Sequence, residues 1–158
     1  MGRQSPRVYA DTSVFGGAFD EEFRHASRAF FDMVSHRRFT LVTSALVAEE
    51  VALAPTEVRE WYDHFAGRAE VVDLSAEALR LRQAYVAAGI VTAKAAADAM
   101  HVALATVNTC LMLVSWNCQH IVHYRRIPRY NAVNTLHGYN EVAIHTPLEV
   151  IGDENQDL

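Results

Sequence analysis

The sequence predicts an α/β fold in which a central, mainly parallel sheet is covered by helices on both faces. Short apolar and β-branched runs alternate with longer segments whose apolar residues recur at helical spacing. The run LMLVS, residues 111–115, is apolar enough for a strand that is buried on both faces. This alternation is typical of parallel sheets, whose binding sites form beyond the carboxyl ends of the strands.

The first half of the chain is expected to contain three strands and three helices. The strands are expected at 7–10, 38–44 and 69–75, and the helices at 22–36, 45–53 and 56–66. The last of these helices follows Pro55, a residue that is tolerated at the start of a helix but not inside one.

The second half is expected to contain two helices and two strands. A helix over 75–89 has Ser75 as a candidate N-cap and Gly89 as a candidate stop. The segment 92–107 is rich in alanine, the strongest helix former, and is expected to be helical. Strands are then expected at 111–115 and 141–146.

Composition indicates one domain with a substantial core, because 51% of the 158 residues are hydrophobic and 21% are charged. Two cysteines are too few for a disulfide scaffold, and we find neither an export leader nor an apolar run of membrane-spanning length. We therefore expect a cytoplasmic protein with no membrane partner. The net charge of −5 argues against a uniformly basic surface for nucleic acid.

A local basic segment remains possible at 123–130, HYRRIPRY. Its arginines either form a solvated helix face or, if they face the acidic residues, can hold phosphate groups through bidentate hydrogen bonds.

Asp11 lies directly after the first expected strand, in the stretch VYADTSVFGG. An aspartate in this position can cap the following helix or open a turn. A chemical role requires that other acidic residues converge on it. Glu49 and Glu50 follow the second strand on a helix, and because adjacent helical residues point about 100° apart, only one of them can face the strand ends.

Asp98 interrupts an alanine-rich helical stripe, where an unpaired carboxylate is costly to bury. Either an arginine or a divalent cation can compensate for that cost. Carboxylates within about 4 Å repel one another by about 1 to 4 kcal/mol per pair, and a hard cation reverses the sign of that energy. Mg²⁺ prefers oxygen ligands and commonly completes its shell with phosphate oxygens, so an acidic cup of this kind indicates a phosphate-bearing substrate.

Five segments in order, ADTSVFGG, TSALVAEEV, ADAMHVALAT, LVSWNCQHIV and HTPLEVI, resemble the PIN-domain family and in particular its VapC-like toxins. The resemblance extends over about 7–151 of a single expected domain, 1–158. It implies a three-layer α/β/α sandwich and a Mg²⁺- or Mn²⁺-dependent endoribonuclease. It also implies an RNA substrate, a homodimer and a cognate antitoxin from a type II toxin–antitoxin module.

Carried over by position, the resemblance makes Asp11, Glu50 and Asp98 the catalytic acids and metal ligands, with Glu49 as the substitute for Glu50. Ser13 and Ser115 support the site. At the fourth acidic position this chain has Asn117, whose amide carries no charge and therefore weakens cation binding. In the implied reaction, a metal-bound water attacks the phosphodiester and leaves 5′-phosphate and 3′-hydroxyl ends.

Two other functions were compared with this one. An aspartyl-nucleophile phosphatase requires a second aspartate two residues after the first, where this chain has Ser13. A catalytically weak or inactive PIN-like module that acts through protein binding stays open as the alternative.

Several other residues have both a structural and a chemical interpretation. His101 either fills the core or orients an acid, and Trp116 either packs or stacks on a base. Cys118, His120 and His123 lack a fourth zinc ligand and lie in a segment that we expect to be helical. The phenylalanines of the first quarter are expected in the core or at a dimer face, namely Phe15, Phe19 and Phe23.

Overall fold

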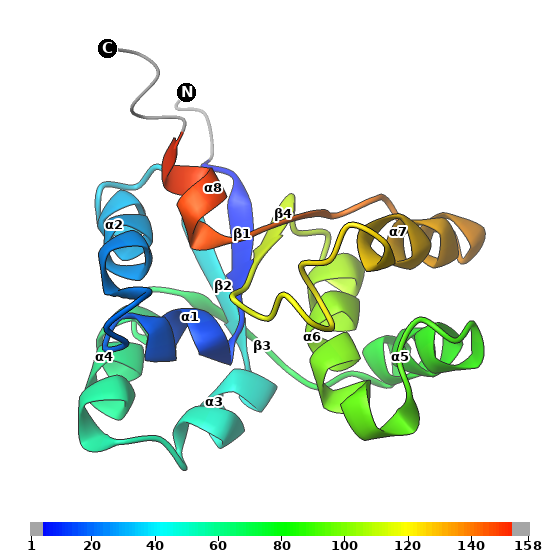
Figure 1. Ribbon diagram of the computed structural model, residues 1–158, viewed down its shortest axis with the longest axis horizontal. Helices are drawn as coiled ribbons and strands as arrows, with labels where there is room; N and C mark the ends of the chain where they lie inside the picture. The colour runs from blue at the N-terminus through cyan, green and yellow to red at the C-terminus, as the bar shows by residue number, and fades with distance from the viewer. Residues whose placement is uncertain (1–4, 153–158) are drawn as a thin grey trace.

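A computed structural model describes residues 5–152 and contains a five-stranded sheet with helices on both faces (Figure 1). The strands are β1 (Arg7–Ala10), β2 (Thr40–Ser44), β3 (Glu70–Val72), β4 (Met112–Val114) and β5 (Ala143–His145). Their spatial order is β3-β2-β1-β4-β5, and every neighbouring pair is parallel. The predicted fold class is therefore confirmed, with a sheet that is wholly rather than mainly parallel.

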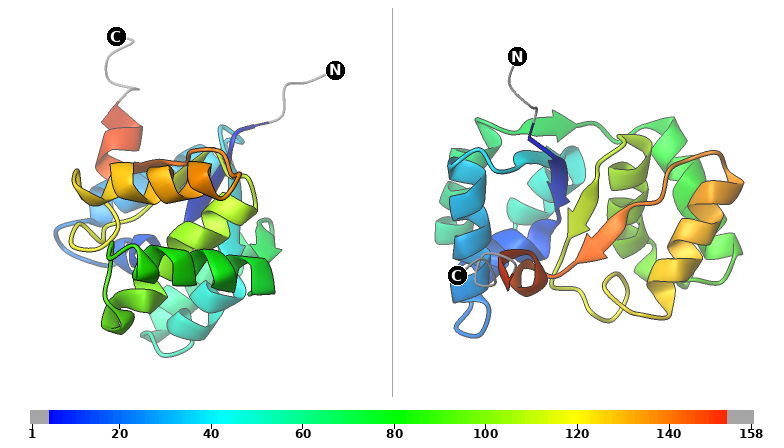
Figure 2. Two further views of the ribbon diagram at one scale, coloured as in Figure 1. Left: turned by 90° about the vertical axis from the view of Figure 1, so that its right-hand side faces the viewer. Right: turned by 90° about the horizontal axis from the view of Figure 1, so that it is seen from above.

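Helices cover the two faces of this sheet. The helices are α1 (Thr12–Gly17), α2 (Arg24–Ser35), α3 (Ala45–Val51), α4 (Thr56–Ala66), α5 (Ala76–Ala87), α6 (Ala96–Val107), α7 (Arg126–Leu136) and α8 (Pro147–Gly152), with a 3₁₀ turn, η1 (Ala93–Ala95), before α6. One layer contains α1, α2 and α4, and the other contains α5, α6 and α7 (Figures 1 and 2). The short α8 packs against α2.

Two helices, α1 and α8, were not among the expected elements, and α7 extends well beyond the basic segment 123–130, for which a solvated helix face was one of two interpretations. The segment around 118–123, which we expected to be helical, instead forms turns, and that expectation was wrong. In these turns the N–H groups of Ile121 and Val122 both donate to the Asn117 carbonyl, and side chains bond to the remaining groups of His120: its N–H donates to Asn117 Oδ1 at 2.9 Å, and Tyr130 donates to its carbonyl at 2.8 Å. The helix that includes most of the basic segment begins only at Arg126.

The core on the α1 side of the sheet is aromatic. The rings of Phe15, Phe31 and Tyr62 meet at centroid distances of about 5 Å, in the tilted and edge-on geometries that aromatic pairs prefer. Trp116 stacks on Phe23 at 4.2 Å and donates its indole N–H to Ser27, so one face and the polar edge of this half-buried tryptophan are engaged in packing.

The strands end together at one edge of the sheet, as parallel pairing requires. β1 runs into α1 and β2 runs into α3 without a connecting loop, so the residues that follow each strand stay close to the sheet. Among residues 5–152, no helix combines the length and the apolar character needed to cross a membrane.

Candidate active site

Asp11 occupies the first position beyond β1 and is almost completely buried, with 3% of its surface exposed. It sits at the N-cap position of α1, yet its side chain makes no capping hydrogen bond. Instead, the hydroxyl of Ser13 donates to Oδ1 at 2.6 Å and the hydroxyl of Ser115 donates to Oδ2 at 2.5 Å. Both serines therefore contact the acid that they were predicted to support.

Burial raises the pKa of the Asp11 carboxyl above its usual value. His101 and the two serine hydroxyls oppose that rise, whereas the nearby Glu50 carboxylate adds to it. A buried carboxylate beside a second one is an environment in which a cation would be stabilised.

Glu50 lies on α3, directly after β2, and is held by two donors. His101 Nε2 lies 2.7 Å from Glu50 Oε1, and the hydroxyl of Thr12 donates to the same oxygen at 2.8 Å. Burial disfavours ionisation of Glu50, but these hydrogen bonds and the charge of His101 outweigh it and lower the pKa of the carboxyl. Glu49, by contrast, is exposed.

His101 is buried and extends this arrangement into the core. Its Nδ1 lies 2.8 Å from the hydroxyl of Tyr9, which also pairs with Ser44 at 2.7 Å. Ser44 in turn caps α3 by accepting from Val47 N–H. His101 is thus a core residue that also orients an acid, and the acid that it orients is Glu50.

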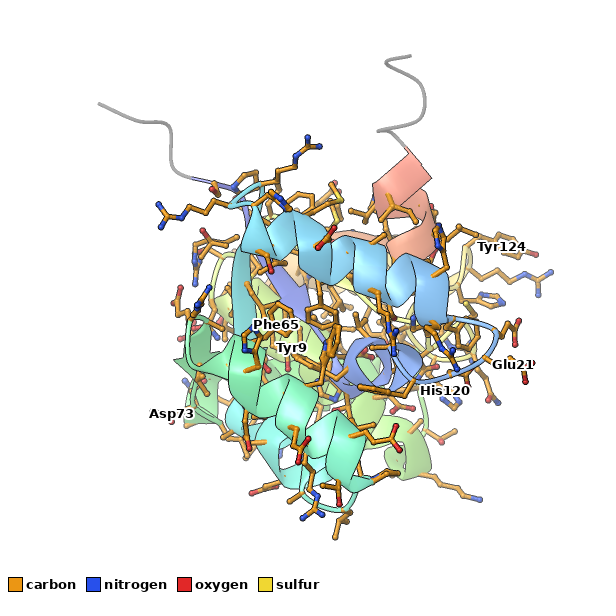
Figure 3. The ribbon with its side chains drawn as sticks, turned by 90° about the vertical axis from the view of Figure 1, so that its left-hand side faces the viewer. Tyr9, Glu21, Phe65, Asp73, His120 and Tyr124 are labelled. Atoms are coloured by element: carbon orange, nitrogen blue, oxygen red, sulfur yellow. The ribbon has the colours of Figure 1, made fainter. Side chains whose placement is uncertain are left out.

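Asp98 lies in the first turn of α6, three residues before His101, and is paired with His120. Asp98 Oδ2 and His120 Nδ1 are 2.9 Å apart. Of the two partners considered from the sequence, an arginine or a divalent cation, the arginine does not occupy this position, where His120 lies instead. Tyr9 is fully buried whereas His120 is half-buried, and both are labelled in Figure 3.

Asn117 connects His120 to Asp11. Its backbone N–H donates to Ser115 Oγ at 2.9 Å, and its amide oxygen accepts from His120 N–H at 2.9 Å. The oxygen that we expected to replace a fourth carboxylate is therefore engaged with the backbone.

These contacts form a closed path that we call the polar ring. Hydrogen bonds link Asp11 through Ser115, Asn117 and His120 to Asp98, and one turn of α6 leads to His101. The path continues through Glu50 and Thr12, which is covalently joined to Asp11. All four predicted catalytic residues belong to the ring, whose members are Asp11, Thr12, Glu50, Asp98, His101, Ser115, Asn117 and His120.

The ring does not amount to a closed metal cage, because no three His, Cys, Asp or Glu side chains in residues 5–152 form a cluster able to hold an ion. The donor chemistry nevertheless fits a hard cation. Within the described chain, the hydrogen bonds of Glu50 and Asp98 each use one carboxylate oxygen and leave the other without a partner. Mg²⁺ is commonly held by one or two carboxylates together with water, so a full protein cage is not required.

Three members of the ring, Thr12, His101 and His120, were not predicted as site residues. Thr12 is adjacent to Asp11, and no feature of the sequence marked it as a residue that would contact Glu50. His101 could be placed on the Asp98 face of α6 from its spacing, but its contact with Glu50 depends on how α6 packs against α3. His120 was considered only as a zinc ligand, since its partner is 22 residues away in the sequence.

Glu50→Gln is expected to lower the RNA cleavage that the family resemblance implies by at least about tenfold, because the amide removes the charge at the oxygen left free for a cation. Glu49→Gln makes the same chemical change one residue away on an exposed side chain and is expected to leave the rate unchanged. Initial cleavage rates of the two variants provide the measurement. The reverse ranking would contradict the assignment of Glu50.

The comparisons with known proteins are consistent with this fold. No protein-family model matches the chain, and no curated protein matches it. Among solved structures, VapBC2 from Rickettsia felis bound to a promoter DNA fragment matches with a TM-score of 0.59 and 16% identity, over 89% of this chain and 98% of that one. FitAcB from Neisseria gonorrhoeae matches with a TM-score of 0.55 and 18% identity, over 89% and 97% of the two chains.

A third structure, VapC20 from Mycobacterium tuberculosis, is described as a sarcin-ricin loop cleaving toxin. It matches with a TM-score of 0.53 and 12% identity, over 85% of this chain and 98% of that one. At these identities the likeness shows a shared fold. The PIN-like architecture that the sequence motifs imply is therefore confirmed as a fold.

Proposed function

We propose that this protein is a metal-dependent endoribonuclease, the toxin of a toxin–antitoxin pair. The observation that carries the proposal is the buried Asp11 carboxylate, which shares one polar ring with Glu50 and Asp98 at the carboxyl edge of a parallel sheet. Support comes from VapC20, a structural neighbour described as a sarcin-ricin loop cleaving toxin. The sequence motifs support a cognate antitoxin and a homodimer as its partners.

In the proposed mechanism, Asp11 and Asp98, with Glu50 directly or through water, would hold Mg²⁺ or Mn²⁺, which when bound acidifies water and neutralises phosphate charge. The remaining members of the ring position these acids. Ser13 and Ser115 fix both oxygens of Asp11, so the carboxylate cannot rotate away from the strand end.

The other two acids are positioned by histidines. His101, backed by Tyr9, holds one oxygen of Glu50, and His120 holds one oxygen of Asp98. Asn117 accepts through its oxygen, which leaves its NH₂ group as a donor for a phosphate oxygen. The site therefore combines acids for a cation with a neutral donor for the substrate.

The test is cleavage of single-stranded RNA by the purified protein with Mg²⁺ or Mn²⁺, with and without EDTA. Cleavage is expected only with the metal, and 5′-phosphate ends identify water as the nucleophile. A second readout does not depend on activity: the metal should raise the melting temperature, because it relieves the buried charge of Asp11. Metal-independent cleavage would contradict the proposal, and binding of RNA or protein without cleavage would favour the inactive-module alternative.

A further inference from the structure

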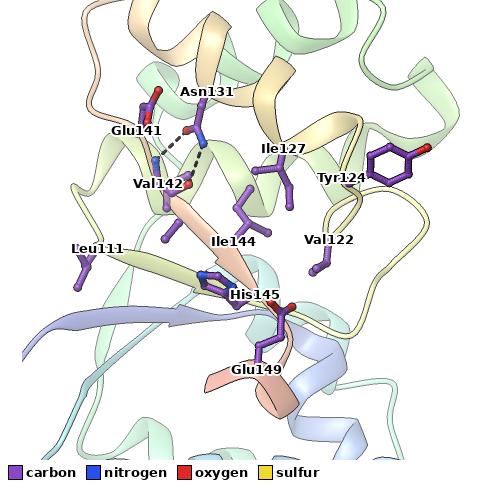
Figure 4. A pocket seen from close by; sticks show the side chains of 11 residues that line it. Leu111, Val122, Tyr124, Ile127, Asn131, Glu141, Val142, Ile144, His145 and Glu149 are labelled. Carbon is purple, nitrogen blue, oxygen red and sulfur yellow. Dashed lines mark hydrogen bonds and ion pairs between the residues drawn. The ribbon is translucent and has the colours of Figure 1, made fainter. Parts of the chain in front are cut away.

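Tyr124 is a large aromatic residue that remains 72% exposed at the end of the loop that follows β4. It lies at the rim of an apolar groove of about 640 Å³ that is lined by residues of this loop, α7 and β5. Figure 4 shows the ring directed away from the groove, whose walls include Val122, Ile127 and Ile144. The ring therefore contributes little to the packing of the groove and presents its surface to solvent.

The residues directly before and after Tyr124 both have planar side-chain groups that lie close to its ring. The His123 ring stacks on it at a centroid distance of 5.1 Å and an interplanar angle of 21°. The Arg125 guanidinium lies 5.4 Å from the ring centroid, and its Nε donates to the Tyr124 hydroxyl at 2.9 Å. We call these three residues, His123, Tyr124 and Arg125, the aromatic platform.

The sequence segment that contains the platform is basic, whereas the opposite wall of the groove contributes Glu141 and Glu149. Residues 117–130 contain three arginines and two histidines but no acidic residue, although the chain has a net charge of −5. Arg126 and Arg129 donate to the carbonyls of Ile90 and Ala88 and so tie α7 to the end of α5. Arg125 differs, because no carboxylate in the described chain forms an ion pair with it.

The platform lies close to the polar ring along the chain. His120, the partner of Asp98, is four residues before Tyr124, so the two Cα atoms are at most about 14 Å apart. The loop between them is anchored, since Tyr130 holds the His120 carbonyl from α7. A nucleic acid strand whose phosphate reaches Asp98 can therefore place a neighbouring nucleotide on the platform.

We propose that the aromatic platform binds single-stranded RNA beside the scissile phosphate, with a base stacked against the platform at Tyr124 and a phosphate held by Arg125. Proteins commonly bind single-stranded nucleic acid through exposed aromatic rings and nearby arginines. Every base has a flat face that can stack on a ring, and every phosphodiester carries a negative charge that an arginine can neutralise. In duplex RNA the bases are already stacked, so the platform selects unpaired segments. This proposal rests on the proposed ribonuclease function and specifies where its substrate lies.

The experiment measures binding of a fluorescent oligouridine to the full chain in EDTA, where cleavage cannot occur, by anisotropy at several salt concentrations. Tyr124→Ala is expected to weaken binding by about tenfold, whereas Tyr124→Trp retains it. Arg125→Gln is expected to lower the slope of log affinity against log salt concentration by about 1, because one phosphate contact is lost. A duplex RNA of the same length should not distinguish wild type from Tyr124→Ala.

Leu136→Ala is the matched control, because Leu136 is 82% exposed at the far end of α7 and should not affect binding. Cleavage with Mg²⁺ is measured in parallel, and Tyr124→Ala should raise KM more than it lowers kcat. If wild type cleaves RNA and Tyr124→Ala binds and cleaves equally well, the platform proposal is overturned while the ribonuclease stands.

Two further outcomes separate the two proposals. A wild-type protein that neither binds nor cleaves RNA overturns both. A Tyr124→Ala variant that keeps its RNA affinity but changes its oligomeric state overturns the platform proposal in favour of a protein contact.

Discussion

Replacing Asp98 by asparagine is expected to abolish RNA cleavage, with a loss of at least about a hundredfold, and to leave the fold intact. The physical reason is charge. The substituted side chain can still accept the hydrogen bond from His120 through its amide oxygen, but it offers a cation no negative charge. Substitution of a residue that only supports a metal ligand typically lowers metal affinity or activity by about 10- to 100-fold. Loss of a proposed ligand should therefore lower the cleavage rate further.

The control is Glu57→Gln, which removes a negative charge from the first turn of α4, as Asp98→Asn removes one from the first turn of α6. Each change should lower stability by no more than about 1 kcal/mol, the usual value of a charge near a helix N-terminus. Cleavage rates and thermal unfolding monitored by circular dichroism provide the two measurements. Cleavage by Asp98→Asn at the wild-type rate would remove Asp98 from the site.

Gly17→Ala is expected to lower the free energy of unfolding by about 1 to 3 kcal/mol, the usual cost of overpacking a tight site. A β-carbon at Gly17 would lie 2.6 Å from Ser27 Oγ and 2.7 Å from Trp116 Nε1, two atoms that are hydrogen-bonded to each other. Trp116 also donates its backbone N–H to Ser13, so its displacement should disturb the support of Asp11 and reduce cleavage as well.

Gly16→Ala is the matched control for this prediction, because no atom lies within 4 Å of a β-carbon at that neighbouring position. Within a helix this change should be neutral or stabilising by about 0.5–1 kcal/mol. Urea unfolding of both variants compares the two effects directly. Equal stabilities would show that the Trp116 contact is not tight in solution.

Much of the fold followed from local sequence patterns. The alanine-rich segment and the helix after Pro55 were placed within a few residues, because propensity and a helix-start signal agreed there. Ser44 and Ser75 cap helices as their residue type favours. The segment 118–123 was wrongly predicted to be helical. Its turns combine bonds from the N–H groups of Ile121 and Val122 to the Asn117 carbonyl with a bond from Tyr130, which lies on a later helix.

The candidate site was predictable to a different extent. Position after a strand and position within an apolar stripe drew attention to Asp11 and Asp98, and the family resemblance then made them site residues, an assignment that stays a prediction. The partners of the acids were not predictable, because contacts such as Glu50–His101 and Asp98–His120 join residues that are 51 and 22 positions apart. Such pairs depend on how α6 packs against the strand ends, which local patterns do not encode.

The arrangement of the polar ring has an evolutionary consequence. It consists of two runs of hydrogen bonds, from Asp11 to Asp98 and from His101 to Thr12, joined only through the covalent chain. Replacing one residue should therefore alter the penalty for replacing another residue of the same run. Lineages that drift at one of these positions should accept compensating changes at its hydrogen-bonded partners, and the order in which those changes arise should decide which are tolerated.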